Sequence, residues 1–278
     1  MLPVEILDYI FSYLDVHSLK ASSKAHPVLS HIAERHLYVR ITLQNHEEYN
    51  SSDSQLSLEV GQLSDLLSER PHIANYVLFL TINVGEGDDK LFPFLEAIPS
   101  ILALLLKLRT VVLNWTSTMG RVKFNKYPNL PEDFCSSLAK SFELISMKKV
   151  KFYGIRIPLS LLHRCGNTIE KLVFDRCIVS QSDDSEVESS SSGCPPLEDL
   201  RITKINNRSL KTLVHWVANG CRQLRQFRFS PFDKRDEDPF VLIKPILVSC
   251  SNTLTILDVD LGSLCRFNSA RLIFFSQS

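Results

Sequence analysis

The chain lacks several features that would place it in a specialised class of protein. Its 278 residues carry no formal net charge, because 31 lysines and arginines are matched by 31 aspartates and glutamates. This balance excludes a globally basic nucleic-acid-binding protein, and we expect no nucleic-acid partner. Apolar residues make up 44% and charged residues 22%, which are ordinary values for a globular chain of one or two domains.

Long apolar runs are also missing. The most apolar segment, residues 91–108, contains two prolines, Glu96 and Lys107. A membrane-spanning helix needs about 20 mainly apolar residues, so we interpret this segment as a buried core helix. The N-terminus carries Glu5 and Asp8 but no basic start, which argues against a signal peptide. We therefore expect no membrane association.

Paired cysteine motifs and catalytic motifs are absent as well. The seven cysteines are odd in number and never form a C-x-x-C pair, which favours free thiols inside the cell, in the cytoplasm or nucleus. The sequence contains no G-x-S-x-G, H-E-x-x-H or Walker motif. The eight histidines show no spacing typical of a metal site or a general base. We expect neither an enzyme nor a cofactor or metal.

What the chain does contain is an internal repeat. The pattern apolar–x–x–apolar–x–apolar occurs seven times, and its last two positions predict short strands with alternating burial. The seven occurrences are Val77/Leu80/Ile82, Leu108/Val111/Leu113, Met147/Val150/Phe152, Ile169/Leu172/Phe174, Leu197/Leu200/Ile202, Leu224/Phe227/Phe229 and Leu254/Leu257/Val259.

Segments with helical spacing lie between these strands. Examples are the apolar positions at Leu210, Leu213, Val214 and Val217. A strand followed by a helix in about 20–29 residues is the leucine-rich-repeat unit. Such units share one core when stacked, so residues 46–278 are predicted to form a curved α/β solenoid with a parallel sheet and about seven irregular units.

The repeat gives the cysteines a structural role. Cys165, Cys177, Cys194, Cys221 and Cys250 recur near the repeat positions, which predicts small buried thiols. The repeat is interrupted at 180–193 by a serine-rich acidic segment, which we interpret as a solvated loop or as a phosphorylation segment. The apolar end of the chain, 261–278, has no polar capping unit. We expect its apolar side chains either to cover the last repeat or to leave the edge of that repeat exposed.

Residues 1–45 predict a separate helical unit. Pro3 suits the start of a first helix with an apolar stripe, Asp15 can cap a second, and His26-Pro27 separates the second from a third. Residues 39–43 look like a strand leading into the repeats. Three short helices supply little core, so the first helix must pack on the repeats or leave an apolar patch for a partner.

This N-terminal unit resembles an F-box. The resemblance rests on Leu2-Pro3-x-Glu5-Ile6-Leu7-x-x-Ile10-x-x-Tyr13-Leu14, on Leu19-Lys20-Ala21, and on Arg35-His36-Leu37-Tyr38 before Ile41. The later Arg70-Pro71-His72-Ile73-Ala74-x-Tyr76-Val77 is similar to fungal F-box proteins with leucine-rich repeats.

The resemblance implies an adaptor of a cullin-RING ubiquitin ligase. An F-box docks a Skp-type linker protein, which connects it to a cullin, while the repeats hold a protein substrate. By position, the residues that would face the linker or support that face are Leu2, Pro3, Ile6, Ile10 and Leu14. The alternative is a leucine-rich-repeat interaction scaffold without a ubiquitin role, whose first helices only cap the solenoid.

The strand pattern also predicts which side chains face outward. Alternation places one central row at Thr81, Val112, Lys151, Val173, Arg201, Arg228 and Asp258. The predicted substrate-binding residues of this concave face are Lys149, Lys151, Tyr153, Lys171, Arg201 and Arg228. Such a basic stripe would hold an acidic or phosphorylated peptide, unless it is simply a solvated face or is covered by the 180–193 segment.

Overall fold

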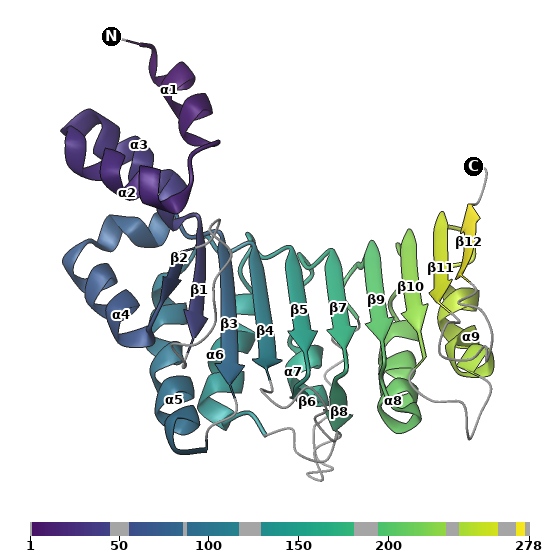
Figure 1. Cartoon of the computed structure of the whole chain (residues 1–278). Helices are drawn as coiled ribbons and strands as arrows, with labels where there is room; N and C mark the ends of the chain where they lie inside the picture. Colours follow the sequence, from purple (N-terminus) through teal and green to yellow (C-terminus); the bar gives the residue numbers. More distant parts are fainter. Residues whose placement is uncertain are drawn as a thin grey trace.

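The protein is an α/β fold built on a large, mainly parallel sheet (Figure 1). The computed structural model describes residues 2–44, 56–85, 88–116, 129–180, 194–231, 239–260 and 271–275. Within these ranges one sheet contains ten strands, whose order in space nearly follows their order in sequence. From one edge to the other they are β2 (Leu56–Leu58), β1 (Arg40–Gln44), β3 (Phe79–Gly85), β4 (Thr110–Thr116), β5 (Lys149–Tyr153), β7 (Lys171–Asp175), β9 (Asp199–Thr203), β10 (Gln226–Ser230), β11 (Ile256–Asp260) and β12 (Arg271–Phe275).

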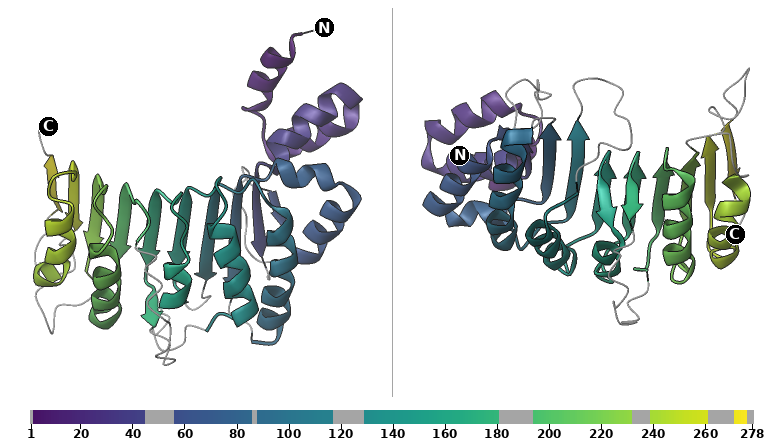
Figure 2. Two further views of the ribbon diagram at one scale, coloured as in Figure 1. Left: turned by 180° about the vertical axis from the view of Figure 1, so that it is seen from behind. Right: turned by 90° about the horizontal axis from the view of Figure 1, so that it is seen from below.

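Helices cover one face of this sheet, because parallel neighbours require crossover connections. The covering helices are α5 (Asp88–Leu104), α6 (Glu132–Phe142), α7 (Leu159–His163), α8 (Asn207–Ala218) and α9 (Pro239–Ser249) (Figure 2). A small second sheet pairs β6 (Arg156–Pro158) with β8 (Ile178–Ser180). All pairs in the large sheet are parallel except β11 with β12, which is antiparallel.

All seven predicted repeat strands are present, as β3, β4, β5, β7, β9, β10 and β11. The strand expected at 39–43 is β1, and the apolar segment 91–108 forms most of the buried helix α5, as expected. Four strands were not anticipated, namely β2, β6, β8 and β12. Three of these are three residues long, which is too short for an alternating pattern to stand out in the sequence.

Alternation within each strand places the core between the sheet and its helices. On β5, Val150 and Phe152 are fully buried, and the next strand, β7, continues the layer with Leu172 and Phe174. The rings of Phe152 and Phe174 stack with their centroids 5.6 Å apart. This core runs without interruption from β1 to β11.

The repeat cysteines are buried in this same core, as the sequence predicted. Cys165, Cys177, Cys194, Cys221 and Cys250 are all buried with free thiols. Desolvation raises the pKa of the Cys194 thiol to about 12. Burial likewise raises the pKa of the Cys165 and Cys177 thiols, and a raised pKa favours the neutral thiol, which packs as a small apolar group.

Three helices form a head at the N-terminal end of the sheet (Figure 1). They are α1 (Val4–Phe11), α2 (Val16–Ala25) and α3 (Pro27–Tyr38). Their boundaries follow the predicted signals, since the Asp15 carboxylate accepts a hydrogen bond from the Ser18 amide at 2.6 Å at the start of α2. His26 is extended and separates α2 from α3, and Pro27 is the first residue of α3.

The head has its own small cluster of six buried residues, distinct from the sheet core. These residues are Phe11, Leu19, Ile32, Ala33, Leu37 and Leu56. The last of them belongs to β2, so the edge of the sheet contributes to the head. Two further elements, α4 (Val60–Glu69) and the 3-10 helix η1 (Pro71–Asn75), follow β2 and lead into β3.

Two segments singled out in the sequence lie largely outside the described residues. The acidic segment is described only at Ser180, in β8, and 181–193 lies outside the described residues, as does 261–270 of the apolar C-terminal segment. Among the helices that the structure describes, none combines the length and apolar character needed to cross a membrane.

Candidate functional site

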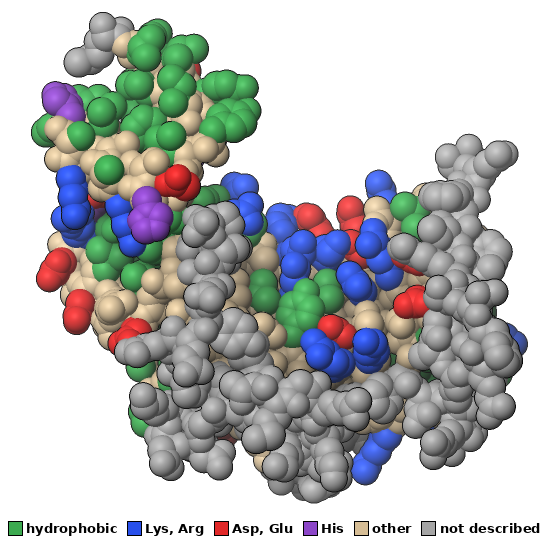
Figure 3. All heavy atoms as spheres, in the orientation of Figure 1, with side chains coloured by type: hydrophobic (Ala, Val, Ile, Leu, Met, Phe, Trp, Pro, Cys, Tyr) green, Lys and Arg blue, Asp and Glu red, His purple; other side chains and the backbone are tan. Residues whose placement is uncertain are grey.

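The first candidate surface is the outer side of α1. Leu2, Val4, Ile6, Tyr9, Ile10 and Tyr13 are all exposed, and we call this set the apolar head face. The exposed fractions reach 47% for Ile6, 42% for Ile10 and 72% for Tyr13. In Figure 3 apolar side chains accordingly gather around the top of the head.

The opposite side of α1 anchors it to the head core. Phe11 is only 5% exposed, and Leu7 and Leu14 are half-buried against the same cluster. Of the five residues predicted to face or support a linker surface, Leu2, Pro3, Ile6 and Ile10 are exposed, while Leu14 turns toward the core. Leu14 lies seven residues after Leu7 and three after Phe11, which is the spacing of one helix face, and all three pack in or against the head cluster.

Sequence reasoning missed part of this face. Tyr9 and Tyr13 lie four residues apart, and their hydroxyl oxygens are 2.9 Å apart in a hydrogen bond. Their rings meet edge to face with centroids 5.1 Å apart. The spacing of four, which places residues on one helix face, was the signal that identifies the pair.

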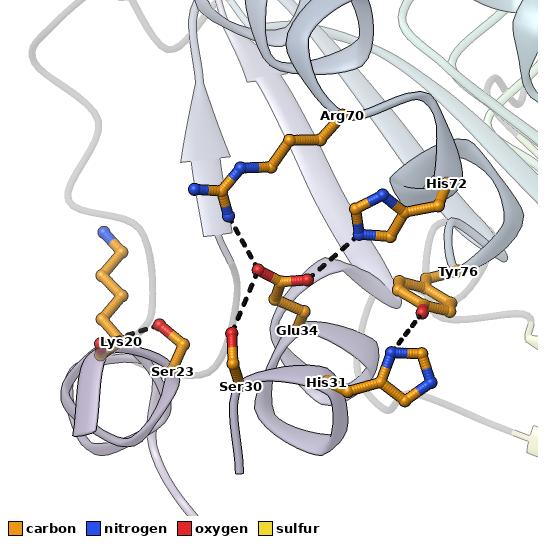
Figure 4. A network of polar contacts seen from close by, with 8 residues as sticks. All are labelled: Lys20, Ser23, Ser30, His31, Glu34, Arg70, His72 and Tyr76. Atoms are coloured by element: carbon orange, nitrogen blue, oxygen red, sulfur yellow. Dashed lines mark hydrogen bonds and ion pairs between the residues drawn. The ribbon is translucent and has the colours of Figure 1, made fainter. Parts of the chain in front are cut away.

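A second feature is a polar network that joins the head to the sheet body (Figure 4). Glu34 on α3 is buried, and its carboxylate accepts hydrogen bonds from Arg70 at 2.7 Å and from Ser30 at 3.4 Å. The His72 ring lies 3.2 Å from the second carboxylate oxygen. Since Arg70 and His72 flank or belong to η1, this network connects α3 to the body through a buried charge.

Three further polar contacts involve head residues. The His31 ring and the Tyr76 hydroxyl, 3.1 Å apart, add a link between α3 and the residue after η1. Within the head, Asp8 of α1 contacts His36 at 2.7 Å and forms an ion pair with Arg35. The hydrogen bond with His36, assisted by Arg35, lowers the pKa of Asp8.

The third feature is the sheet face that the helices leave open. The central outward row has the predicted register, since Thr81, Val112, Lys151, Val173, Arg201, Arg228 and Asp258 are successive partners across the strands. Lysines and arginines gather over β5 to β10 on this face (Figure 3). Two members of the row, Val173 and Asp258, are nevertheless buried. The long side chains of Lys151 and Arg201 flank Val173 and can cover it with their aliphatic stems.

The charges on this face are unevenly paired. Lys171 forms an ion pair with Asp199 on the neighbouring strand. Lys149 and Lys151 have no ion-pair partner among the described residues. Desolvation, followed by repulsion from neighbouring cations, lowers the pKa of both lysines. The positive charges on β5 are thus held at an electrostatic cost.

A tyrosine, Tyr153, and two cationic residues, Arg176 and Lys204, border this row. Tyr153 is half-buried at the end of β5, and desolvation raises its pKa. The residues that follow β7 and β9, Arg176 and Lys204, have left-handed backbones with φ of 53° and 52°. Both are exposed, and their amides extend the hydrogen bonding to the next strand. Non-glycine residues rarely adopt this conformation, so these cations are placed at some backbone cost.

A cavity of about 300 Å³ lies at the β9–β11 end of the face. Its lining comprises Arg201, Thr203, Arg228, Phe229, Ser230, Asp258 and Asp260. The Arg228 Nε atom is buried and has no hydrogen-bond partner among the described residues. Among the described residues there is also no group of three or more histidine, cysteine, aspartate or glutamate side chains that could hold a metal ion.

No protein-family model matches this chain, and a search of curated proteins finds no match either.

Proposed function

We propose that this protein is a substrate-recognition adaptor of a cullin-RING ubiquitin ligase. In this proposal the head is an F-box that docks a Skp-type linker, and the open sheet face binds the protein substrate. The chain itself performs no chemistry. The observation that carries the proposal is the apolar head face. Its apolar side chains are exposed, whereas the opposite side of α1 packs against the head cluster.

The small size of the head core supports a partner on its outer side. Six buried residues make a core far below what usually stabilises an independent domain. Burying exposed aliphatic side chains such as Ile6 and Ile10 contributes about 1.5–3 kcal/mol each when they are fully covered. A partner that covers the apolar head face would therefore add stability comparable to that of the head core.

The arrangement of the sheet supports the repeat half of the proposal. Consecutive strands lie side by side, and the helices that connect them lie on one face only. This is the arrangement expected of a leucine-rich-repeat solenoid, in which each unit buries its apolar face against the next. Among the described residues no helix covers the other face along β4 to β10, and in this proposal the substrate binds there.

The contact between head and body favours an adaptor with a fixed geometry and argues against two loosely linked modules. The buried Glu34 network and the shared residue Leu56 hold the head against the edge of the sheet. An adaptor needs this fixed geometry, because it presents a substrate bound on one surface to an enzyme recruited through another.

Co-purification with a purified Skp-type linker tests the proposal. The intact chain should retain the linker, and Ile10→Glu should abolish retention, because a charge would be buried at the centre of the apolar head face. Ile145→Glu is the matched control, since Ile145 is 86% exposed just after α6, away from the head. Failure of the intact, folded chain to retain the linker would defeat the adaptor assignment.

A scaffold without a ubiquitin role is the second candidate. The observation that favours it is the participation of β2 in the head core, since Leu56 and the half-buried Leu58 pack with α3 residues. In that case the head would serve only to cap the first strand of the sheet. Normal stability and partner binding of an Ile10→Glu protein, together with no linker binding by the intact chain, would support the scaffold.

A further inference from the structure

Two cysteines occupy the same position in consecutive repeat units. Cys221 follows α8 and Cys250 follows α9, each at the turn that leads from a helix to the next strand. The Cys221 amide donates a hydrogen bond to the carbonyl oxygen of Val217, four residues earlier. The Cys250 amide does the same with Ile246, again four residues earlier. Equivalent positions of stacked units are neighbours in a solenoid, so this pattern puts the two side chains next to each other.

Hydrogen bonds between the two turns hold these units in contact. The Ser249 hydroxyl, just before the second cysteine, donates a hydrogen bond to the carbonyl oxygen of Ala218 at 2.8 Å. The Thr253 hydroxyl, just after it, donates one to the carbonyl oxygen of Leu224 at 2.9 Å. These two bonds bracket both cysteines in the sequence, so the turn after α9 is fixed against the turn after α8.

The two thiols are fully buried and hydrogen-bond each other. The hydrogen bond from the Cys221 thiol lowers the pKa of Cys250, although burial opposes this effect. The same hydrogen bond, together with desolvation, raises the pKa of Cys221. A lowered pKa favours the thiolate, which is the form of cysteine that attacks an oxidant. The pair therefore combines an attacking sulfur with a second sulfur in direct contact.

A third cysteine, Cys194, lies on the other side of this pair. A side-chain carbon at Gly220 would come within 2.7 Å of the Cys194 Cβ atom, so consecutive turns also stack closely there. The hydrogen bond of the Cys221 thiol nevertheless goes to Cys250. The geometry thus favours one pairing over the other.

We propose that Cys221 and Cys250 form a reversible disulfide when hydrogen peroxide oxidises the protein. The Cys250 thiolate attacks one peroxide oxygen, the O–O bond breaks, and the departing hydroxide takes up the proton that the thiol released. The Cys221 sulfur then attacks the resulting sulfenic acid, the S–O bond breaks, and the hydroxyl leaves as water with the Cys221 proton. Together the two thiols lose two electrons and two protons, and the peroxide is reduced to two water molecules.

The disulfide would join the unit of α9 to the unit of α8. It would close a loop that contains the whole of α9, and such a link restricts how far the loop opens. Disulfides that form in reducing compartments are usually transient and redox-sensing, which fits a buried pair that is reduced in the resting protein. This inference goes beyond the proposed function and does not depend on it.

The first test uses the full, folded chain and graded concentrations of hydrogen peroxide. Remaining thiols are alkylated, the protein is digested without reduction, and mass spectrometry maps the linked peptides. The pair Cys221–Cys250 should form at a lower peroxide concentration than any other linkage and should disappear on treatment with dithiothreitol. Protein unfolded before oxidation is the control and should give a mixture of linkages. A folded chain without this pair, or with an equal yield of Cys194–Cys221, would overturn the proposal.

Variants assign the roles of the two sulfurs. Cys221→Ala should stop the reaction at the Cys250 sulfenic acid, which dimedone labels, while Cys250→Ala should leave Cys221 largely unlabelled. Cys165→Ala, which removes a buried thiol from an earlier unit, should give the same disulfide as the unchanged chain. Labelling of Cys221 in preference to Cys250 would contradict the assigned order of attack. The first test needs no variant, so it decides the pairing even if an alanine variant fails to fold.

Hydrogen exchange measures the structural consequence. Amides of α9 should exchange about tenfold or more slowly in the oxidised protein than in the reduced protein, because the disulfide opposes local opening of this unit. Amides of α6 should exchange equally fast in both states. Equal exchange of α9 in the two states would refute the link between the units. Linker binding enters none of these measurements, so failure of the adaptor proposal and failure of this one are distinguishable.

Discussion

The head and the sheet body bury their side chains on very different scales. The body contains one continuous core from β1 to β11, whereas the hydrophobic cluster of the head has six buried residues among those described, one of them contributed by β2. The body has large fully buried aromatic residues such as Phe152 and Phe227, and the head leaves most of α1 exposed. The comparison teaches that the sheet body buries a large core of its own, while the head buries little and shares part of its cluster with the edge of the sheet.

The largest effect should follow from a change in the body core. Phe227 is fully buried on β10, and Phe227→Ala should lower the free energy of unfolding by about 3–5 kcal/mol through lost transfer energy and a cavity. Chemical denaturation measures this loss. Ile145→Ala, at an exposed site, should change the unfolding free energy by less than about 0.5 kcal/mol. Equal effects of the two changes would contradict the assignment of the core.

A matching change in the head should act locally. Phe11→Ala removes the largest buried side chain of α1, and the expected loss of about 3 kcal/mol is comparable to what so small a core supplies. We expect α1 to α3 to lose protection in hydrogen exchange while β4 to β9 keep theirs. Val28→Ala, at an exposed position in α3, is the control. Simultaneous loss of protection in the sheet would show that head and body unfold as one unit.

Removal of the charge on the buried Glu34 carboxylate, which lies between head and body, should have an intermediate effect on the unfolding free energy. Glu34→Gln removes the charge that Arg70 and His72 share, and should lower the unfolding free energy by about 1–3 kcal/mol. Glu69→Gln, at an exposed position on α4, should have almost no effect. In a double-mutant cycle, Glu34→Gln and Arg70→Gln should be less than additive, and strict additivity would rule out the coupling.

The smallest effect should be a gain in stability on the open face. Lys151 has its pKa lowered by desolvation and by neighbouring cations, so Lys151→Met should raise the unfolding free energy by about 0.5 kcal/mol. Lys140→Met, at an exposed position on α6, is the matched control. A loss of stability in place of the gain would argue against a strained cation cluster.

The lowered pKa of Lys151 also predicts how the unfolding free energy depends on pH. A lysine whose pKa is lowered by folding binds fewer protons in the folded state than in the unfolded state once the pH passes that lowered value. The unfolding free energy should therefore rise with pH between the lowered pKa and the ordinary lysine pKa. Lys151→Met should flatten this rise in pH-dependent denaturation.

The strands of the sheet could be predicted well because each repeat carries the same local signal. Leu200 and Ile202 alternate with polar residues, and this pattern marks both the strand and its buried face. The helix boundaries in the head also followed local rules, with Asp15 as a cap and Pro27 as the first residue of α3. The strand β2 escaped prediction because three residues are too few to show a period.

The candidate surfaces could be predicted only in part. Alternation correctly placed Lys151, Arg201 and Arg228 in one row. It did not predict that Val173 and Asp258, in the same row, are buried, because their burial depends on neighbours from other strands. Periodicity also grouped Leu14 with Ile10 in one apolar stripe, whereas the structure leaves Ile10 exposed and packs Leu14 against the head cluster.

The amino-acid sequence by itself determined the seven repeat strands, the breaks between the head helices and the burial of the five repeat cysteines, because each of these depends on residues within a few positions of one another. The tertiary structure alone decided which side of α1 stays uncovered. It also brought Glu34 to Arg70 and left the Nε atom of Arg228 buried without a hydrogen-bond partner among the residues that the structure describes. Such features arise where distant segments meet, and the local periodicity of a sequence contains no information about which partners those segments will find.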